Sequence, residues 1–352
     1  MEFKIGNVNC SPDHVTIIAE AGVNHLGRFD LAEDLISSAA NAGADIIKFQ
    51  TYKADDLTLK DAPRFWDWEG EEDSNGSQHD SYSLLDSFGE DEHIELSKLC
   101  RKHNIEFMST PFSADAAEML VRTGVNAFKL ASCDITNLPF LKDIASFKKP
   151  ILLSTGAATI DEIGNAVSVI KDVDQNANIC IMQCTLCYPT EYDDAHLNAL
   201  SHLNKEFPDH LLGLSDHTLG YHIPLASIAL GARVIEKHYT VDKTLPMSAD
   251  HWLSIDPKEL ELLCNYSSHV LKGLGSYQKM KHPCEDKTHS FARRSIVTIK
   301  DITKGDIIDK SSLACKRPGT GIAPAYLEKI IGSKATRDIA SDSLLEESDF
   351  EL

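Results

Sequence analysis

Two lysines lie inside short runs of the sequence that are otherwise apolar. Lys48 stands in DIIKFQT and Lys129 stands in AFKLAS. Burying a lysine in an apolar strand costs free energy unless an anionic group lies beside it. The pair therefore indicates a site for a doubly charged anion, such as a phosphate together with a carboxylate. A Schiff-base nucleophile is an alternative role for either lysine, and a structural lysine is the simplest one.

Two histidines end neighbouring apolar runs near residue 230. His217 stands in GLSDHT, and His238 follows IEK in the next run. Side chains alternate along a strand, so Glu236 and His238 share one face and Lys237 points the other way. Two such imidazoles suit a divalent metal with open coordination positions, although hydrogen-bonding histidines are the alternative.

Other polar side chains also stand where apolar runs end. Glu20 closes the first run, and Gln50 shares a face with Lys48. Hydroxyl groups at the ends of the next runs, with the N–H groups that follow them, suit a phosphate. These hydroxyls belong to Thr110, Ser132 and Ser154.

The runs that carry these residues alternate with helical patterns. Helical periodicity is clearest at residues 30–41, 91–103, 161–171, 195–206 and 257–271. The eight apolar runs cover residues 15–20, 45–51, 105–110, 127–132, 150–155, 178–185, 211–215 and 232–238. This alternation predicts an α/β fold, a (β/α)₈ TIM barrel whose strand ends meet at one face. A doubly wound open sheet is the alternative, but no G-x-G-x-x-G follows the first run.

The pattern divides the chain into three parts. Residues 1–271 form the predicted barrel, residues 272–292 a linker, and residues 293–352 a small domain of short strands and turns. Residues 53–89 are a long insertion after the second strand, with an acidic middle at 69–80. Loops of that length are typically lids or mobile segments.

Composition excludes several classes of protein. The 352 residues carry 34 basic and 54 acidic side chains, a net charge of −20. We expect no nucleic-acid partner, because no basic stripe is present, and no membrane span, because no apolar run is long enough. Nine scattered cysteines and the absence of a signal-peptide pattern favour the cytoplasm. The C-x-x-C at residues 184–187 has no partner pair, so we interpret it as structural.

Together these motifs resemble the sialic acid synthase (NeuB-type) family. The resemblance lies in IAEAGVNHLG, AGADIIKFQT, STPF, FKLAS, PILLSTG, YPT, GLSDHT and EKHYT, in that order along the chain. ARRSIV and KRPGTGI, near the C-terminus, resemble the antifreeze-like (SAF, β-clip) domain. The resemblance covers essentially the whole chain.

The resemblance implies a cytoplasmic transferase of sialic acid biosynthesis. Such enzymes condense phosphoenolpyruvate with an N-acylated amino-hexose, forming a nine-carbon 2-keto-3-deoxy acid and releasing phosphate by C–O cleavage. It also implies a divalent metal, Mn²⁺ first and Mg²⁺ or Co²⁺ as alternatives. A domain-swapped homodimer is expected, with the antifreeze-like domain of one subunit over the barrel mouth of the other.

The resemblance also assigns roles to individual residues. His217 and His238 match metal ligands, and Glu20 matches a catalytic carboxylate. Tyr188 and Asp250 match sugar contacts, and Arg317 matches an arginine contributed across the dimer. Positions that hold phosphoenolpyruvate are matched by Lys48, Gln50, Thr110, Lys129, Ser132 and Ser154.

Two departures bear on the acceptor sugar. Asp134 stands where sialic acid synthases often carry Glu, and Leu186 stands where N-acetylneuraminate synthases commonly carry Asn. A less polar wall suits a 6-deoxy diacetamido sugar, so N-acetylneuraminate and legionaminate synthase are joint first hypotheses. Pseudaminate and spore-coat polysaccharide synthases share the pattern. A Schiff-base aldolase and a carbohydrate-binding protein are the alternatives from other classes.

Overall fold

The computed structural model describes residues 2–66, 76–245 and 250–351. The chain forms two compact units, Met1–Gly275 and Ser276–Leu352. Each unit is described by itself below.

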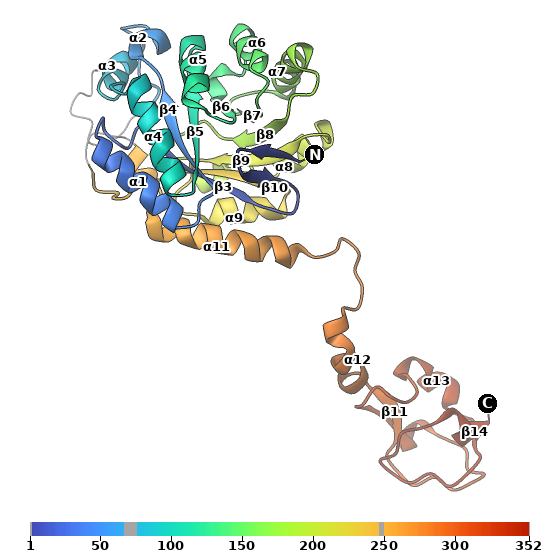
Figure 1. Cartoon of the computed structure of the whole chain (residues 1–352). Coiled ribbons are helices and arrows are strands. Elements are labelled where there is room, and N and C mark those ends of the chain that lie inside the picture. The colour runs from blue at the N-terminus through green and yellow to red at the C-terminus, as the bar shows by residue number, and fades with distance from the viewer. Residues whose placement is uncertain (1, 67–75, 246–249, 352) are drawn as a thin grey trace. The chain divides into compact units, whose positions relative to one another are not determined.

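The first unit is built on a parallel sheet of eight strands (Figure 1). The strands follow one another around the sheet in sequence order, and the last pairs with the first, β10 with β3. β5 and β6, at the two ends of the hydrogen-bonded order, lie against each other. The predicted (β/α)₈ barrel is therefore confirmed. Its strands are β3 (Thr16–Gly22), β4 (Ile46–Thr51), β5 (Glu106–Pro111), β6 (Phe128–Leu130), β7 (Ile151–Ser154), β8 (Ile179–Cys184), β9 (Leu211–Asp216) and β10 (Ala232–His238).

Helices connect successive strands and surround the sheet. Local sequence explains where several of them begin: Thr159 and Glu162 form a capping box at the start of α7, and Asp256 and Glu259 do so at α11. The helices are α1 (Phe29–Asn41), α4 (Glu90–Lys102), α5 (Ala114–Thr123), α6 (Leu138–Ser146), α7 (Ile160–Val173), α8 (Ala199–Glu206), α9 (His222–Ala229) and α11 (Pro257–Leu274).

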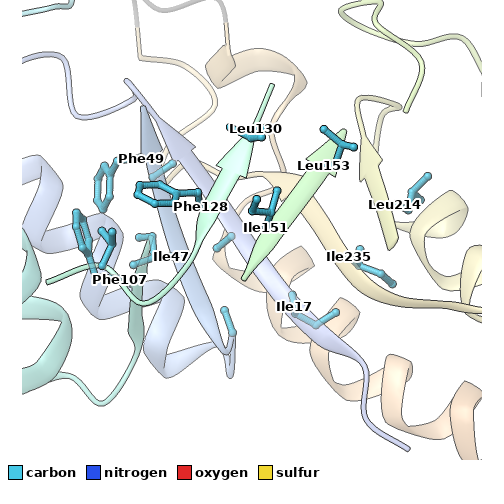
Figure 2. Packing of buried hydrophobic residues seen from close by; sticks show 14 of the residues in the cluster. Ile17, Ile47, Phe49, Phe107, Phe128, Leu130, Ile151, Leu153, Leu214 and Ile235 are labelled. Carbon is cyan, nitrogen blue, oxygen red and sulfur yellow. The ribbon is translucent and has the colours of Figure 1, made fainter. Parts of the chain in front are cut away.

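The main apolar core lies between the strands and these helices. Side chains on the outer face of the barrel, such as Ile47, Phe49 and Phe128, pack there with fully buried helix residues such as Leu35 and Ile144 (Figure 2). Strand side chains alternate, so filling this outer layer turns the intervening residues toward the barrel axis.

A hairpin that the sequence did not indicate closes the amino end of the barrel. Strands β1 (Phe3–Ile5) and β2 (Val8–Cys10) pair antiparallel. Phe3 and Ile5 pack in a second apolar cluster with inward-facing strand residues that include Ile18 and Ile46. Glu106 also reaches the hairpin turn, where a Cβ at Gly6 would lie 2.1 Å from its Oε2.

The long insertion after β4 carries two short helices, α2 (Ala54–Leu57) and α3 (Gln78–Ser83). Much of the acidic stretch at 69–80, namely residues 69–75, lies outside the described residues. A further short helix, α10 (Asp250–Leu253), precedes α11.

The second unit has four short strands in two antiparallel pairs. They are β11 (Ser295–Thr298) with β12 (Leu313–Lys316), and β13 (Lys334–Ala335) with β14 (Phe350–Glu351). Its core is a small apolar cluster around Ile296, Ile308 and Leu345. Short helices, α12 (Asp286–Ala292) and α13 (Leu327–Ile330), complete this unit.

Several boundaries differ from the sequence expectation. β6 stops at Leu130, and Ser132 lies in a 3₁₀ turn. α11 continues to Leu274, and part of the predicted linker forms α12, whose first turn carries Asp286 where the helix dipole favours an acid. Within the described residues, no helix is long and apolar enough to cross a membrane.

We predict that His25 makes the barrel unit acid-sensitive. His25 is buried against Phe88, and burial lowers its pKa to about 4. In the unfolded state His25 is protonated below its ordinary pKa of about 6.5, whereas in the folded state it stays neutral down to about pH 4. Acid between these two values therefore stabilises the unfolded state. Acidification from pH 7 to pH 4 should therefore cost the wild type about 3 kcal/mol more than His25→Phe. Urea unfolding followed by tryptophan fluorescence measures the difference, and parallel pH profiles would contradict it.

Candidate active site

The inward-facing side chains form layers along the barrel axis. Nearest the hairpin is an apolar layer that includes Ile46 on β4 and Val234 on β10. Two residues further along the same strands stand Lys48 and Glu236, and two further again stand Gln50 and His238. Polarity therefore increases toward the carboxyl ends of the strands, where barrel enzymes carry their active sites.

A buried network of two lysines and two glutamates forms the charged layer. Lys48 Nζ lies 2.8 Å from Glu20 Oε2 and 3.9 Å from Glu236 Oε1, while Lys129 Nζ lies 3.4 Å from Glu236 Oε1. All four residues are at most 3% exposed. Ser215 Oγ also donates to Glu236 at 3.1 Å. Such charges are tolerated in a barrel interior only because each has an opposite charge beside it.

The two carboxyl groups of this network differ in acidity. Burial raises the pKa of Glu20 more than the ammonium group of Lys48 lowers it. Burial would raise the pKa of Glu236 too, but Lys129 and Lys48 together hold it well below its usual range. Two carboxyl groups with separated pKa values can divide the roles of proton carrier and fixed anion.

Hydroxyl groups lie at the carboxyl ends of β5 and β7 and in the turn after β6. Lys48 Nζ donates to Thr110 Oγ1 at 2.8 Å, and the Oγ atom of Ser154 is buried without a hydrogen-bond partner. The N–H of Gly156 donates to Ser132 Oγ at 2.9 Å. That bond occupies an acceptor position of Ser132, which leaves its O–H free to donate to an anion.

Gly156 fits closely because it has no side chain. A Cβ there would lie 2.8 Å from Ser132 Oγ and 3.1 Å from both Cys184 Sγ and Leu186 Cβ. Leu186 therefore lies beside Gly156 and close to Ser132. The wall around Ser132 is thus partly apolar.

The two histidines lie together at the carboxyl ends of β9 and β10. Their ring centroids are 5.2 Å apart, and the ring of Tyr188 lies 4.0 Å from His217 and 5.7 Å from His238. Burial and the neighbouring His238 lower the pKa of His217 to about 3, so its imidazole is neutral. Although burial opposes it, Asp250 raises the pKa of His238.

The donor set fits a divalent metal held by two imidazoles. His217 Nδ1 is bound to the carbonyl oxygen of Thr185 at 2.8 Å, which leaves Nε2 as its ligand atom. His238 Nδ1 is buried without a hydrogen bond and lies 3.4 Å from Asp250 Oδ2. Among the described residues, no group of three or more His, Cys, Asp and Glu side chains could hold a metal ion. The histidine pair would therefore leave the other coordination positions to water and substrate oxygens.

Three predicted site residues converge over Gly22. A Cβ at Gly22 would lie 3.4 Å from Asp250 Oδ2, Gln50 Nε2 and Glu20 Oε1 alike. Gln50 Nε2 also donates to Glu20 Oε1 at 3.0 Å. Because Gly22 has a φ of +52°, a side chain there would be strained as well as crowded.

Two predicted residues stand apart from this group. Asp134 follows Ser132 in the 3₁₀ turn, where its carboxylate accepts from Asn137 Nδ2 at 3.3 Å. Arg317 lies in the second unit, is exposed, and donates from Nε to the carbonyl oxygen of Ala292 at 3.0 Å.

Sequence reasoning left three contributors without a role. Glu236 and Ser215 face the interior by strand alternation, a signal that was available, but their partners follow only from the closed barrel. The sequence indicated N–H groups after the strand-end hydroxyls, but the role of the Gly156 N–H depends on the approach of Ser132 from the turn after β6.

The fold and these side chains together define a TIM-barrel protein with a buried, charged site at the carboxyl ends of its strands. Residues 35–279 match the NeuB family, and residues 293–351 match the SAF domain. The chain therefore belongs to the NeuB family.

Similar proteins cover nearly the whole chain. An N,N'-diacetyllegionaminic acid synthase of Campylobacter jejuni is 40% identical, over 94% of this chain and 98% of its own. The Legionella pneumophila enzyme of the same name is 38% identical, over 94% and 92%. A Leptospira borgpetersenii N-acetylneuraminic acid synthetase structure in complex with citrate is 36% identical, with a TM-score of 0.72 over 82% of this chain and 95% of that one.

We predict that Gly156→Ala weakens anion binding. The added Cβ would displace Ser132 Oγ, and a hydrogen bond to a charged group contributes about 1.5–3 kcal/mol. Affinity for phosphoenolpyruvate, measured by titration calorimetry, should fall about 10- to 100-fold. Gly164→Ala on α7 is the matched control, since nothing beyond its chain neighbours and the backbone of its own helix lies within 4 Å of its added Cβ. Equal affinities in the two variants would refute the role.

Proposed function

We propose that this enzyme condenses phosphoenolpyruvate with 2,4-diacetamido-2,4,6-trideoxymannose to form a legionaminic-acid-type product and phosphate. The observation that carries the proposal is the pair of buried lysines that share Glu236, with Glu20 and Thr110 also bound to Lys48. Lys48 and Lys129 would neutralise the phosphate and carboxylate of phosphoenolpyruvate. Thr110, Ser132 and Ser154 would donate hydrogen bonds to the same oxygens.

The barrel would hold the methylene carbon of phosphoenolpyruvate over the aldehyde carbon of the open-chain sugar. As the new carbon–carbon bond forms, the enol carbon that bears the phosphate becomes cationic. Glu236, held as an anion by the two lysines, would stabilise that charge. Water then adds to the cationic carbon, and the C–O bond to phosphate breaks to leave the 2-keto group.

Glu20 would transfer the proton to or from the aldehyde oxygen. Its raised pKa suits a group that carries a proton, and its Oε1 lies beside Gln50 and the Asp250 carboxylate over Gly22. His217 and His238 would hold a divalent metal, Mn²⁺ first, which when bound polarises the aldehyde as a Lewis acid. Tyr188 and Asp250 are placed beside these histidines to contact the sugar.

The choice of acceptor rests on two supports. Leu186, beside Ser132, offers an apolar contact for a deoxygenated sugar. Two relatives, at 40% and 38% identity, are named as N,N'-diacetyllegionaminic acid synthases. N-acetylmannosamine is the second candidate, because the Leptospira structure is named as an N-acetylneuraminic acid synthetase.

We propose that the enzyme is cytoplasmic and that it is a homodimer. All nine cysteines are free thiols, in keeping with a reducing compartment. The exposed guanidinium of Arg317 is available to contact the sugar bound by a second subunit, as the family resemblance implies.

The direct test is phosphate release by metal-stripped protein, with and without Mn²⁺, for each acceptor. We expect Mn²⁺-dependent release with both sugars and a higher kcat/KM for the diacetamido sugar. A methylene-sized apolar contact contributes about 1–3 kcal/mol, so the preference should be about 10- to 200-fold. Leu186→Asn should reduce this ratio of kcat/KM values, because the polar side chain would favour N-acetylmannosamine.

Two outcomes would contradict the proposal. Metal-independent activity, together with borohydride trapping of a pyruvate adduct on the protein, would favour a Schiff-base aldolase. Binding of the sugars without phosphate release would favour a carbohydrate-binding protein.

Arg317 provides a separate test of the dimer. Arg317→Ala should raise KM for the sugar while KM for phosphoenolpyruvate stays unchanged, because only the sugar would reach the second subunit's arginine. Lys310→Ala in the same unit, which removes an exposed ion pair with Glu328, is the control. Unchanged sugar kinetics in Arg317→Ala would remove this residue from the site.

A further inference from the structure

A buried ion pair lies on the side of the barrel wall opposite to the two histidines. Asp216 precedes His217, and Lys237 precedes His238, so strand alternation turns both side chains away from the barrel interior. Lys237 Nζ lies 2.7 Å from Asp216 Oδ2, and the two residues are only 0% and 4% exposed. They are also direct partners in the pairing of β9 with β10.

Thr218 extends this contact to the residue after His217. Its Oγ1 donates to both carboxylate oxygens of Asp216, at 3.1 and 2.9 Å, and Lys237 Nζ donates to its carbonyl oxygen. Both chain neighbours of His217 are thus fixed to the residue that precedes His238. None of these groups faces the charged layer of Lys48 and Glu236.

Stability alone does not account for a pair of charges in this position. Removing two ions from water costs several kcal/mol each, and an apolar pair of similar volume is often equally stable. An ion pair does differ from an apolar contact in fixing one register and one orientation. Here the register that it fixes is the one that brings the two imidazoles to a centroid distance of 5.2 Å.

We propose that Asp216 and Lys237 are positioning residues that hold His217 and His238 in the arrangement that binds a divalent metal. This inference rests on the proposed function, in which the two histidines are the metal ligands. Thr185 orients the ring of His217 from one side through Nδ1. The Asp216–Lys237 pair fixes the backbone beneath both rings, and residues that orient metal ligands typically change affinity 10- to 100-fold when altered.

The test compares Mn²⁺ affinity with fold stability. The variant is Asp216→Asn with Lys237→Met, which removes both charges while keeping similar volumes. The control is Glu90→Gln with Arg122→Met, which removes an ion pair of 2.9 Å between α4 and α5 that adjoins neither histidine. Free Mn²⁺ is measured by electron paramagnetic resonance during titration, and thermal unfolding is measured on the metal-free proteins.

We expect the Asp216/Lys237 variant to bind Mn²⁺ about 10- to 100-fold more weakly, with a thermal midpoint no lower than that of the control. Wild-type affinity in this variant would overturn the inference, whatever its thermal midpoint. If it does not fold, Asp216→Asn alone is measured, and unchanged affinity in that isosteric variant would overturn the inference equally. A wild-type protein that binds no Mn²⁺ would overturn the metal assignment itself, and the inference with it.

Discussion

Two ammonium groups and two carboxylates buried in one barrel are the constraint on which the site depends. A lysine cannot stay charged in an apolar interior unless an anion neutralises it, and here each lysine contacts Glu236. The arrangement is electrically balanced without a ligand. An anion that binds there would therefore compete with Glu20 and Glu236 for the same ammonium groups.

The rest of the first unit serves to place these charges at one depth. The outer faces of the strands pack against helices through residues such as Ile47 and Phe128, which sets the tilt and alternation of each strand. Each inward side chain then has a fixed height along the axis. Glu236 and His238 differ by one step of this alternation, which separates the group that balances the lysines from the group that would bind metal.

Much of this could be predicted from the sequence, because parallel strands in a barrel are continuous apolar runs in which a single charge is conspicuous. Lys48 and Lys129 were found in that way, and alternation correctly placed Lys237 on the outer face. The β1–β2 hairpin was not found, since three-residue strands show no periodicity and the hairpin depends on contacts with distant residues such as Ile18. The hydrogen bond between Gly156 and Ser132 could not be predicted for the same reason, because it joins two turns that are 24 residues apart in the sequence.

The hairpin beneath the barrel has a kinetic consequence. Because β1 and β2 close the amino end, the described residues leave the carboxyl ends of the strands as the route to the charged layer. In the proposed reaction, an anion bound for Lys48 would pass the level of Gln50 and His238, where the sugar would bind. The two substrates would then stand in series, and the anion would have to enter first. A sugar that arrived first would form a dead-end complex, and excess acceptor would slow turnover.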